Sequence, residues 1–451
     1  MDRILAISCF LLALVIVLVA FPEGATAVLV LTACSVIAVA IIRHSTEDDG
    51  FLQRIFIIGL LLRIAFGTII HVFDLRDFLG SDALLYDELG SRLAGVWAGN
   101  ILPNADYLTQ RATEMTGPGW GMNYVVGFIY SIVGRNILAA QFFCAVIGAA
   151  IAPMVYYCTY KIFGNRKVGS NAAWIVAVFP AFIIWTSQLL KDGLVIFLLV
   201  LSMFAVLQLL EKLNYKVVGL LIFSLFGLVT LRFYIAYIVA IAILGSFLIA
   251  HNNSIQSIFR RVTALVIITL GLAYLGIFST AEEDINKYGN LERIQISREY
   301  LASASQSGYV EDDSDVTTVG GAILALPIGF IYLILAPFPW EVSNFRQLIT
   351  LPEVLLWWAM MPLLISGLWY TIKHRLRKAI GVLLFTLMLS IGYSLFQGNV
   401  GTAYRQRAQI QVFLFIFISV GWTLRQEKKE NQKLAKSLRQ QKIRQRLQAK
   451  T

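Results

Sequence analysis

The sequence predicts an all-α protein that crosses a membrane many times. Of its 451 residues, 58% are hydrophobic and 14% are charged, whereas about a quarter of the residues of a soluble protein are charged. The apolar residues gather in runs of about 20, the length that a helix needs to cross the hydrocarbon core. These runs are 4–21, 26–43, 54–73, 121–134, 137–159, 169–187, 192–210, 216–231, 233–250, 262–280, 321–337, 353–372, 379–396 and 408–424.

Two of the runs are poor candidates for spans. Segment 121–134 is short, and 321–337 ends in the breaker "APFPWE". We therefore predict about 12 transmembrane helices, and up to 14 if both segments cross. The first run is interpreted as a retained helix rather than a signal peptide, because a second span follows at once and no convincing small-residue cleavage site separates them.

The distribution of positive charge favours the twelve-helix topology. With twelve spans the basic loops all face the cytoplasm, as the positive-inside rule requires; these loops are "KIFGNRK", "EKLNYK", "FRR" and "KHRLRK". Counting both weak segments as spans would export the first and third of these loops. The sequence thus predicts a multi-pass protein of the plasma (inner) membrane with both termini cytoplasmic. Its larger outer segments would be 74–136 and 281–352, and the first would carry amphipathic helices along the membrane surface.

The chain divides into a membrane domain, 1–424, and a basic tail, 425–451. The tail holds ten Lys and Arg residues against Glu427 and Glu430. A solvated cytoplasmic tail is the favoured interpretation, and binding to anionic lipid is the alternative. Nucleic acid is not an expected partner, because no aromatic or motif context accompanies the charge.

Cysteine usage and the standard motifs indicate no metal or redox site. Each of Cys9, Cys34, Cys144 and Cys158 falls inside an apolar run, which indicates neither a disulfide framework nor a zinc site. No nucleotide-binding or hydrolase motif occurs in a credible context. We therefore expect no cofactor, and no divalent metal is indicated.

Charged residues at the predicted outer face form the candidate site, because charges near apolar segments are costly and mark function by default. Lys and Arg there can hold a lipid phosphate, and a carboxylate opposite them can accept a proton. The alternative is that the cations only reach toward lipid headgroups. The candidate residues are Asp82 and Asp87 in "SDALLYD", Lys191 and Asp192 in "SQLLKDGL", Arg232 in "LVTLRFY", and Arg405 and Arg407 in "GTAYRQRAQ".

Local patterns add two geometric expectations. Asp87 and Glu88 should face solvent on the helix that begins near Asp82. The glycines of "QGNVGTAY" favour an extended turn, in which Arg405 and Arg407 point the same way.

Several ordered motifs resemble the GT-C class of integral-membrane glycosyltransferases, in the branch of the protein mannosyltransferases and lipid A aminoarabinose transferases (family 39-like). They are "GSDALLYDELGSRLA", "GPGWGMNYVVGFIYSIVG", "YYCTYKIFGNRKVGS", "NAAWIVAVFPAFIIWTSQLLKDGLVIFLL" and "YRQRAQIQVFLFIFISVGW". The match is best over 54–210 and extends to 397–423. It departs from the family where Ala83 replaces the second acid of a "DE" pair, and where Lys191–Asp192 stands in place of a second-loop DxD.

The resemblance implies a GT-C fold and a glycosyltransferase that moves a hexose or pentose from a polyprenyl-phosphate donor to a glycan, lipid or protein acceptor at the extracytoplasmic face. It implies Asp82 as the catalytic base, with Tyr86 one turn on, and inversion at the anomeric carbon. The residues that would then bind substrate are Tyr86, Asp87, Lys191, Asp192, Arg232, Arg405 and Arg407. Two other functions remain open: an O-antigen polymerase or ligase acting on undecaprenyl-linked glycans, and a flippase or transporter of lipid-linked glycans.

Overall fold

The computed structural model describes residues 3–45, 50–115, 119–249, 255–275, 290–303, 316–342, 344–396 and 398–448, and within these ranges it contains helices and no β-sheet. The helices are α1 (Arg3–Val19), α2 (Glu23–Ser45), α3 (Phe51–Val72), α4 (Arg76–Gly80), α5 (Asp82–Trp97), α6 (Tyr107–Thr113), α7 (Trp120–Val133), α8 (Ile137–Phe163), α9 (Arg166–Val178), α10 (Pro180–Thr186), α11 (Lys191–Glu211), α12 (Tyr215–Ile249), α13 (Ile255–Tyr274), α15 (Leu291–Ser303), α16 (Val319–Leu335), α17 (Phe345–His374), α18 (Leu376–Phe396) and α19 (Val400–Gln448).

The predicted class, an all-α polytopic membrane protein, is confirmed. Among the described residues, eight helices are long and apolar enough to cross a membrane, and α9 with α10 makes a ninth if this pair, bent by 55°, is one span. Helices α1, α7 and α16, and the last part of α13, are apolar but shorter. Fewer helices therefore pass as full spans than the twelve we predicted, partly because two predicted spans lie in one helix, α12.

Helix α12 consists of two legs that meet at Arg232, whose φ of −153° and ψ of 83° are not helical. In the first leg Gly227 lies against Leu198 of α11, and in the second leg Ser246 lies against Gly381 of α18. Helix α11 begins and helix α18 ends at the same end of the bundle. Both legs of α12 therefore extend from Arg232, at that end, toward the opposite end. The chain therefore reverses at Arg232, which lies between the predicted apolar runs 216–231 and 233–250.

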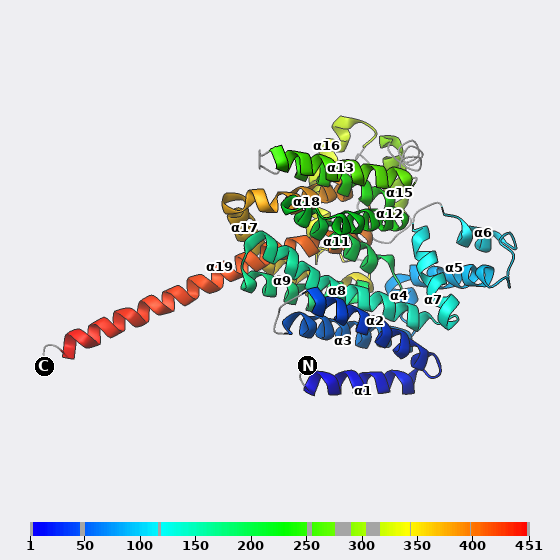
Figure 1. The fold of residues 1–451 in the computed structure, drawn as a ribbon, viewed down its shortest axis with the longest axis horizontal. Helices are drawn as coiled ribbons and strands as arrows, with labels where there is room; N and C mark the ends of the chain where they lie inside the picture. The colour runs from blue at the N-terminus through cyan, green and yellow to red at the C-terminus, as the bar shows by residue number, and fades with distance from the viewer. Residues whose placement is uncertain are drawn as a thin grey trace.

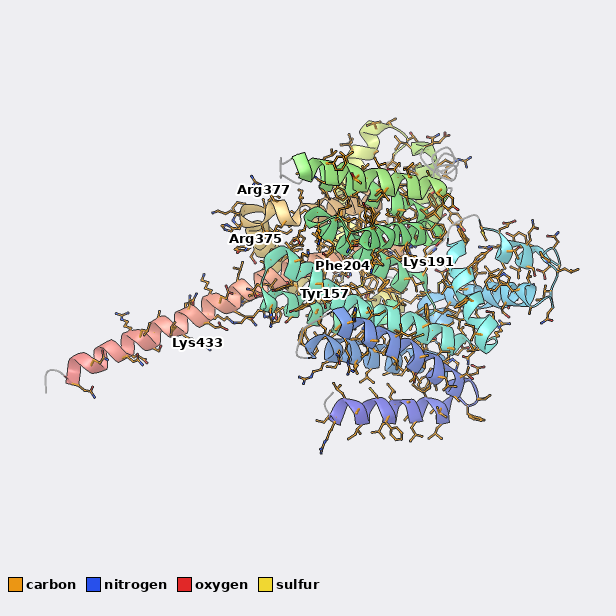
Figure 2. The ribbon with its side chains drawn as sticks, in the orientation of Figure 1. Tyr157, Lys191, Phe204, Arg375, Arg377 and Lys433 are labelled. Carbon is orange, nitrogen blue, oxygen red and sulfur yellow. The ribbon has the colours of Figure 1, made fainter. Side chains whose placement is uncertain are left out.

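The bundle has two distinct ends (Figure 1). Helices α4 to α7 gather at one end, which we call the site end. The second half of α19 projects from the opposite end, the tail end, where α1 also begins. Figure 2 shows Lys191 toward the site end and Arg375, Arg377 and Lys433 toward the tail end. This separation agrees with the predicted sorting of loops, although the orientation in a membrane stays a prediction.

Both ends of the short helix α7 lie at the same end of the bundle. Its N-cap, Gly119, lies beside Lys191, and just beyond its last residue Arg135 forms an ion pair with Asp87 of α5. Both neighbours belong to the site end. The packing is therefore that of a helix lying across the site end, in line with the prediction that 121–134 does not cross.

The second weak segment, α16, packs across the end of α18. The backbone of Gly329 meets the carbonyl of Ser394 near the last turn of α18. The predicted outer segment 281–352 includes 281–289, 304–315 and 343, which lie outside the described residues.

Helices α17 and α19 run side by side, and α19 is the more deeply buried of the two. Gly367 meets the Phe417 carbonyl, and Gly421 meets the Leu363 carbonyl, so a side chain at either glycine would collide with the opposite backbone. The helices approach this closely because small residues allow it. The first half of α19 is thereby fixed in the core, and this fixes the depth of Arg405.

Candidate active site

Four elements bring ionised side chains together at the site end. Asp82 opens α5, Asp192 lies in the first turn of α11, Arg232 occupies the break in α12, and Arg405 lies near the start of α19. The sequence separation between Arg405 and Asp82 is 323 residues, so the tertiary fold alone assembles the group.

Asp192 is the buried centre of this group. Its side chain is 0% exposed. One oxygen accepts a hydrogen bond of 2.8 Å from Arg232 Nη2, and the other accepts one of 2.7 Å from Arg405 Nε. A buried carboxylate needs such compensation, because an unpaired charge in an apolar interior costs several kcal/mol. Asp192 therefore fixes two guanidinium groups and is not itself open to substrate.

Asp82 is the carboxylate of the group that remains open. Its side chain is 45% exposed, and Oδ2 accepts a hydrogen bond of 2.8 Å from Arg405 Nη1. It is the first residue of α5, where the helix dipole favours a negative charge. An exposed carboxylate held in one position on a helix is suited to accept a proton from a bound hydroxyl.

Lys191 contributes a cation that is not neutralised by direct contact. Its ammonium has no hydrogen bond or ion pair with any part of the chain that the structure describes. It lies against Gly119, which has φ of +85°; a Cβ there would come within 2.9 Å of Lys191 Nζ and 3.3 Å of the Tyr86 hydroxyl. Burial, and then the neighbouring Asp82 carboxylate, raise the pKa of Tyr86, so the phenol stays protonated and can donate.

The charge of the five ionised groups is unbalanced. Lys191, Arg232 and Arg405 carry three positive charges, whereas Asp82 and Asp192 carry two negative ones. The sum is one positive charge in a partly buried site. Such a site attracts an anion, and the attraction is stronger than on an open surface because the local dielectric constant is lower.

A buried arginine in α3 helps to hold the chain that leads to Lys191. Phe179 and Pro180 break the span between α9 and α10. Arg63 fills the break, donating to the Thr186 hydroxyl at 2.7 Å and to the Ala177 carbonyl at 3.1 Å. These bonds satisfy polar groups that the bend leaves free.

Arg407 does not join the group, and the expected extended turn is wrong. Helix α19 already begins at Val400, so Arg405 and Arg407 point in different directions, about 200° apart around the axis. Arg407 is fully buried and donates to the carbonyls of Ile334 and Ala336 at 3.1 and 2.6 Å. Both of these bonds use Nη1, and the other terminal nitrogen, Nη2, lies 3.8 Å from Oε2 of Glu353. In this position Arg407 fastens the end of α16 to α19.

Asp87 also lies apart from the group, and the expectation that it faces solvent is wrong. Its side chain is 13% exposed. It accepts hydrogen bonds from the Tyr130 hydroxyl at 2.5 Å and from Arg135 at 2.7 Å. Glu88 is 34% exposed and forms ion pairs with Arg92 and Arg135. Both acids join α5 to its neighbours.

Sequence reasoning missed the aromatic neighbours of the cations. Arg405 lies over the Trp185 ring, 5.7 Å from its centre, and Arg232 donates to the Tyr234 hydroxyl at 3.3 Å. Both aromatics occur within the quoted motifs, close in sequence to candidate residues. No sequence pattern distinguishes these two aromatics from the many others in the chain.

A metal site is not evident in the geometry. Within the described ranges, no three His, Cys, Asp or Glu residues come together in a group that could hold a metal ion. The expectation that the site needs no cofactor stays a prediction.

Comparison with known proteins bears on the central part of the chain. The family model of the dolichyl-phosphate-mannose-protein mannosyltransferases matches residues 119–277, which include Lys191, Asp192 and Arg232. No curated protein matches the chain significantly. The family implies a membrane glycosyltransferase that uses a polyprenyl-phosphate sugar donor. The resemblance seen in the motifs is therefore confirmed over residues 119–277, where this multi-pass membrane protein matches the dolichyl-phosphate-mannose-protein mannosyltransferase family of GT-C glycosyltransferases.

Proposed function

We propose that this protein transfers one sugar from a polyprenyl phosphate to an acceptor hydroxyl, with inversion at the anomeric carbon and Asp82 as the base. The acceptor is a glycan, lipid or protein, and the reaction takes place at the extracytoplasmic face of the plasma (inner) membrane, which would be the site end. The family match supports the donor class.

The observation that carries the proposal is the single guanidinium shared by an exposed and a buried carboxylate. Arg405 contacts Asp82 at 2.8 Å and Asp192 at 2.7 Å. The base is thereby fixed beside the cations Lys191 and Arg405. A phosphate at these cations would place the anomeric carbon near Asp82.

The reaction is a single displacement. Asp82 takes the proton of the acceptor hydroxyl, and the acceptor oxygen forms a bond to the anomeric carbon. The bond from that carbon to the phosphate oxygen breaks, and its electron pair leaves with the polyprenyl phosphate. Lys191 and Arg405 stabilise the extra negative charge of this leaving group, which is the main electrostatic contribution expected in such a step.

Two other candidate residues have supporting roles. Arg232 is 7% exposed and is held by Asp192, so it contributes positive charge and positions the carboxylate rather than contacting the sugar. The Tyr86 hydroxyl and the Lys191 ammonium both lie against Gly119, and in this proposal Tyr86 donates a hydrogen bond to the phosphate. Arg407 is not included, because its guanidinium is bound within the core.

The test uses the full-length protein in liposomes with radiolabelled polyprenyl-phosphate sugars and extracted cell-envelope acceptors. We expect the label to move to the acceptor with the opposite anomeric configuration, as measured by NMR of the released sugar. Retained configuration would contradict a single displacement. Movement of intact lipid-linked sugar across the bilayer would instead indicate a transporter, and use of diphosphate-linked glycans alone would indicate a polymerase or ligase.

A further inference from the structure

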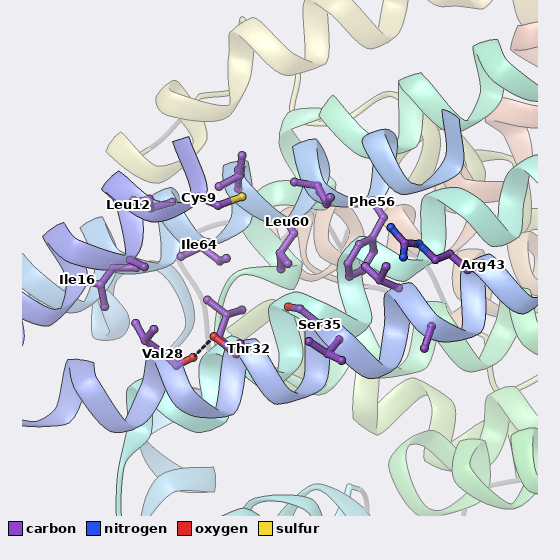
Figure 3. Close-up of a pocket in the computed structure, with 17 residues that line it drawn as sticks. Cys9, Leu12, Ile16, Val28, Thr32, Ser35, Arg43, Phe56, Leu60 and Ile64 are labelled. Atoms are coloured by element: carbon purple, nitrogen blue, oxygen red, sulfur yellow. Dashed lines mark hydrogen bonds between the residues drawn. The ribbon is translucent and has the colours of Figure 1, made fainter. Parts of the chain in front are cut away.

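An apolar cavity lies between α1, α2 and α3, away from the residues of the candidate active site (Figure 3). Its volume is about 510 Å³, which falls within the range of about 300–1,000 Å³ for ligand sites. Its lining includes Ile16, Val28, Val39, Phe56 and Leu60. Because α1 packs loosely on the bundle, with Ile16 as its buried residue, the space beside it stays open.

The chemistry of the lining favours a hydrocarbon chain. Few polar groups face the cavity: Thr32 already donates its hydroxyl to the Val28 carbonyl at 2.7 Å, and the buried Ser35 hydroxyl has no hydrogen-bond partner. An apolar ligand gains burial there, at about 25 cal/mol for each Å² removed from water.

The cavity is longer than one leaflet of the hydrocarbon core. Along α2 it is lined from Val28 to Arg43, a distance of about 22 Å at 1.5 Å for each helical residue. Half of a hydrocarbon core is about 15 Å thick. The cavity is therefore long enough for a complete acyl chain.

A cation stands at one end of the cavity. Arg43 lies in the last turn of α2, at the tail end of the bundle. It lines the cavity and is exposed, and it has no ion pair or hydrogen bond within the described residues. A guanidinium at the depth of the headgroups can bind a phosphodiester through two parallel hydrogen bonds.

We propose that this cavity binds one membrane phospholipid from the leaflet at the tail end, with an acyl chain between α1, α2 and α3 and its phosphate at Arg43. The lipid fills the space that α1 leaves and fastens α1 to the bundle. This site is independent of the proposed transfer reaction.

Native mass spectrometry of the full-length protein, extracted in mild detergent, tests the proposal. We expect one retained phospholipid. Ala13→Phe, which fills the cavity, should abolish its retention, whereas Ala33→Phe on the exposed face of α2 should not. Arg43→Ala should lower retention about fivefold, the size expected for an exposed charge pair. Lys216→Ala, at an exposed lysine of the tail end, is the matched control.

A second measurement avoids any effect of the variants on folding. A phospholipid with a photoreactive diazirine in its acyl chain should label peptides of α1, α2 and α3 in the wild-type protein. The proposal is overturned if no phospholipid is retained and these peptides are not labelled. It is also overturned if Ala13→Phe leaves retention unchanged, or if a polyprenyl phosphate occupies the cavity instead.

Discussion

Arg405 donates to Asp82 at 2.8 Å while its Nε donates to Asp192 at 2.7 Å, so one side chain of α19 links α5 to α11. Asp192 is closed to solvent and Asp82 is 45% exposed. The same residue type thus has two roles: one acid holds the cations, and the other is available to substrate. Burial alone separates these roles.

Asp82→Asn should lower the transfer rate by about 10²–10⁴-fold, the usual contribution of a general base. The amide keeps the size of the side chain and an acceptor for Arg405, so folding and donor binding should persist. Turnover and donor binding are measured with the labelled donor. Asp77→Asn, at an exposed acid of the neighbouring helix α4, is the control, and near-normal turnover in Asp82→Asn would exclude Asp82 as the base.

Arg405→Lys should reduce transfer at least tenfold, because an ammonium cannot replace a fork that contacts two carboxylates. Loss of one charged hydrogen bond costs about 1.5–3 kcal/mol. Arg407→Lys should instead lower the melting temperature and leave the KM for the donor unchanged, since Arg407 holds backbone carbonyls in the core. Equal effects of the two variants on KM would contradict this division.

Asp192→Ala should destabilise the protein by about 3–5 kcal/mol, because it leaves the buried Arg232 without its carboxylate partner and leaves Arg405 with Asp82 alone. The loss is measured as a lower midpoint of thermal unfolding in detergent. Adding Arg232→Met should restore part of the stability by removing one of the uncompensated charges. If Asp192→Ala were as stable as the wild type, the group would not be held by this carboxylate.

Gly119→Ala should raise the KM for the donor, because its Cβ would lie 2.9 Å from Lys191 Nζ and displace the ammonium. Gly99→Ala is a matched control: Gly99 has a similar φ of +76° but nothing within 4 Å of its added Cβ. Both variants should lose about 1–2 kcal/mol of stability from a left-handed backbone. An equal KM in the two would show that Lys191 is not part of the donor site.

Single cysteines in a cysteine-free background should establish the topology. Ser81 and Ser131 lie on either side of most of α7, and both are exposed. If α7 does not cross, a cysteine introduced at either position should react with an impermeant maleimide added outside cells. A cysteine at Ser437, which is exposed on the second half of α19, should not react with the maleimide. If the cysteines at Ser81 and Ser131 reacted from opposite sides of the membrane, α7 would cross it.

The sequence was sufficient for the class of fold and for part of the group of charged residues at the site end, for a physical reason. Long apolar runs have few structures open to them in a membrane, since every backbone polar group must be paired internally. For the same reason, isolated charges such as Lys191, Asp192 and Arg232 were visible against an apolar background. Local turn chemistry was a weaker guide. The glycines of "QGNVGTAY" favoured an extended turn at Arg405, whereas α19 is already helical from Val400.

By itself, then, the sequence determined that this chain forms many membrane helices and that a few cations and acids gather at one end. Only the tertiary structure decided which of them meet. Asp87 and Asp82 are five positions apart in one helix, yet Asp87 turns to Tyr130 and Arg135 while Asp82 turns to Arg405. Neighbouring helices set these partners, because a side chain's direction follows from the helical period but its contacts depend on what packs against that face.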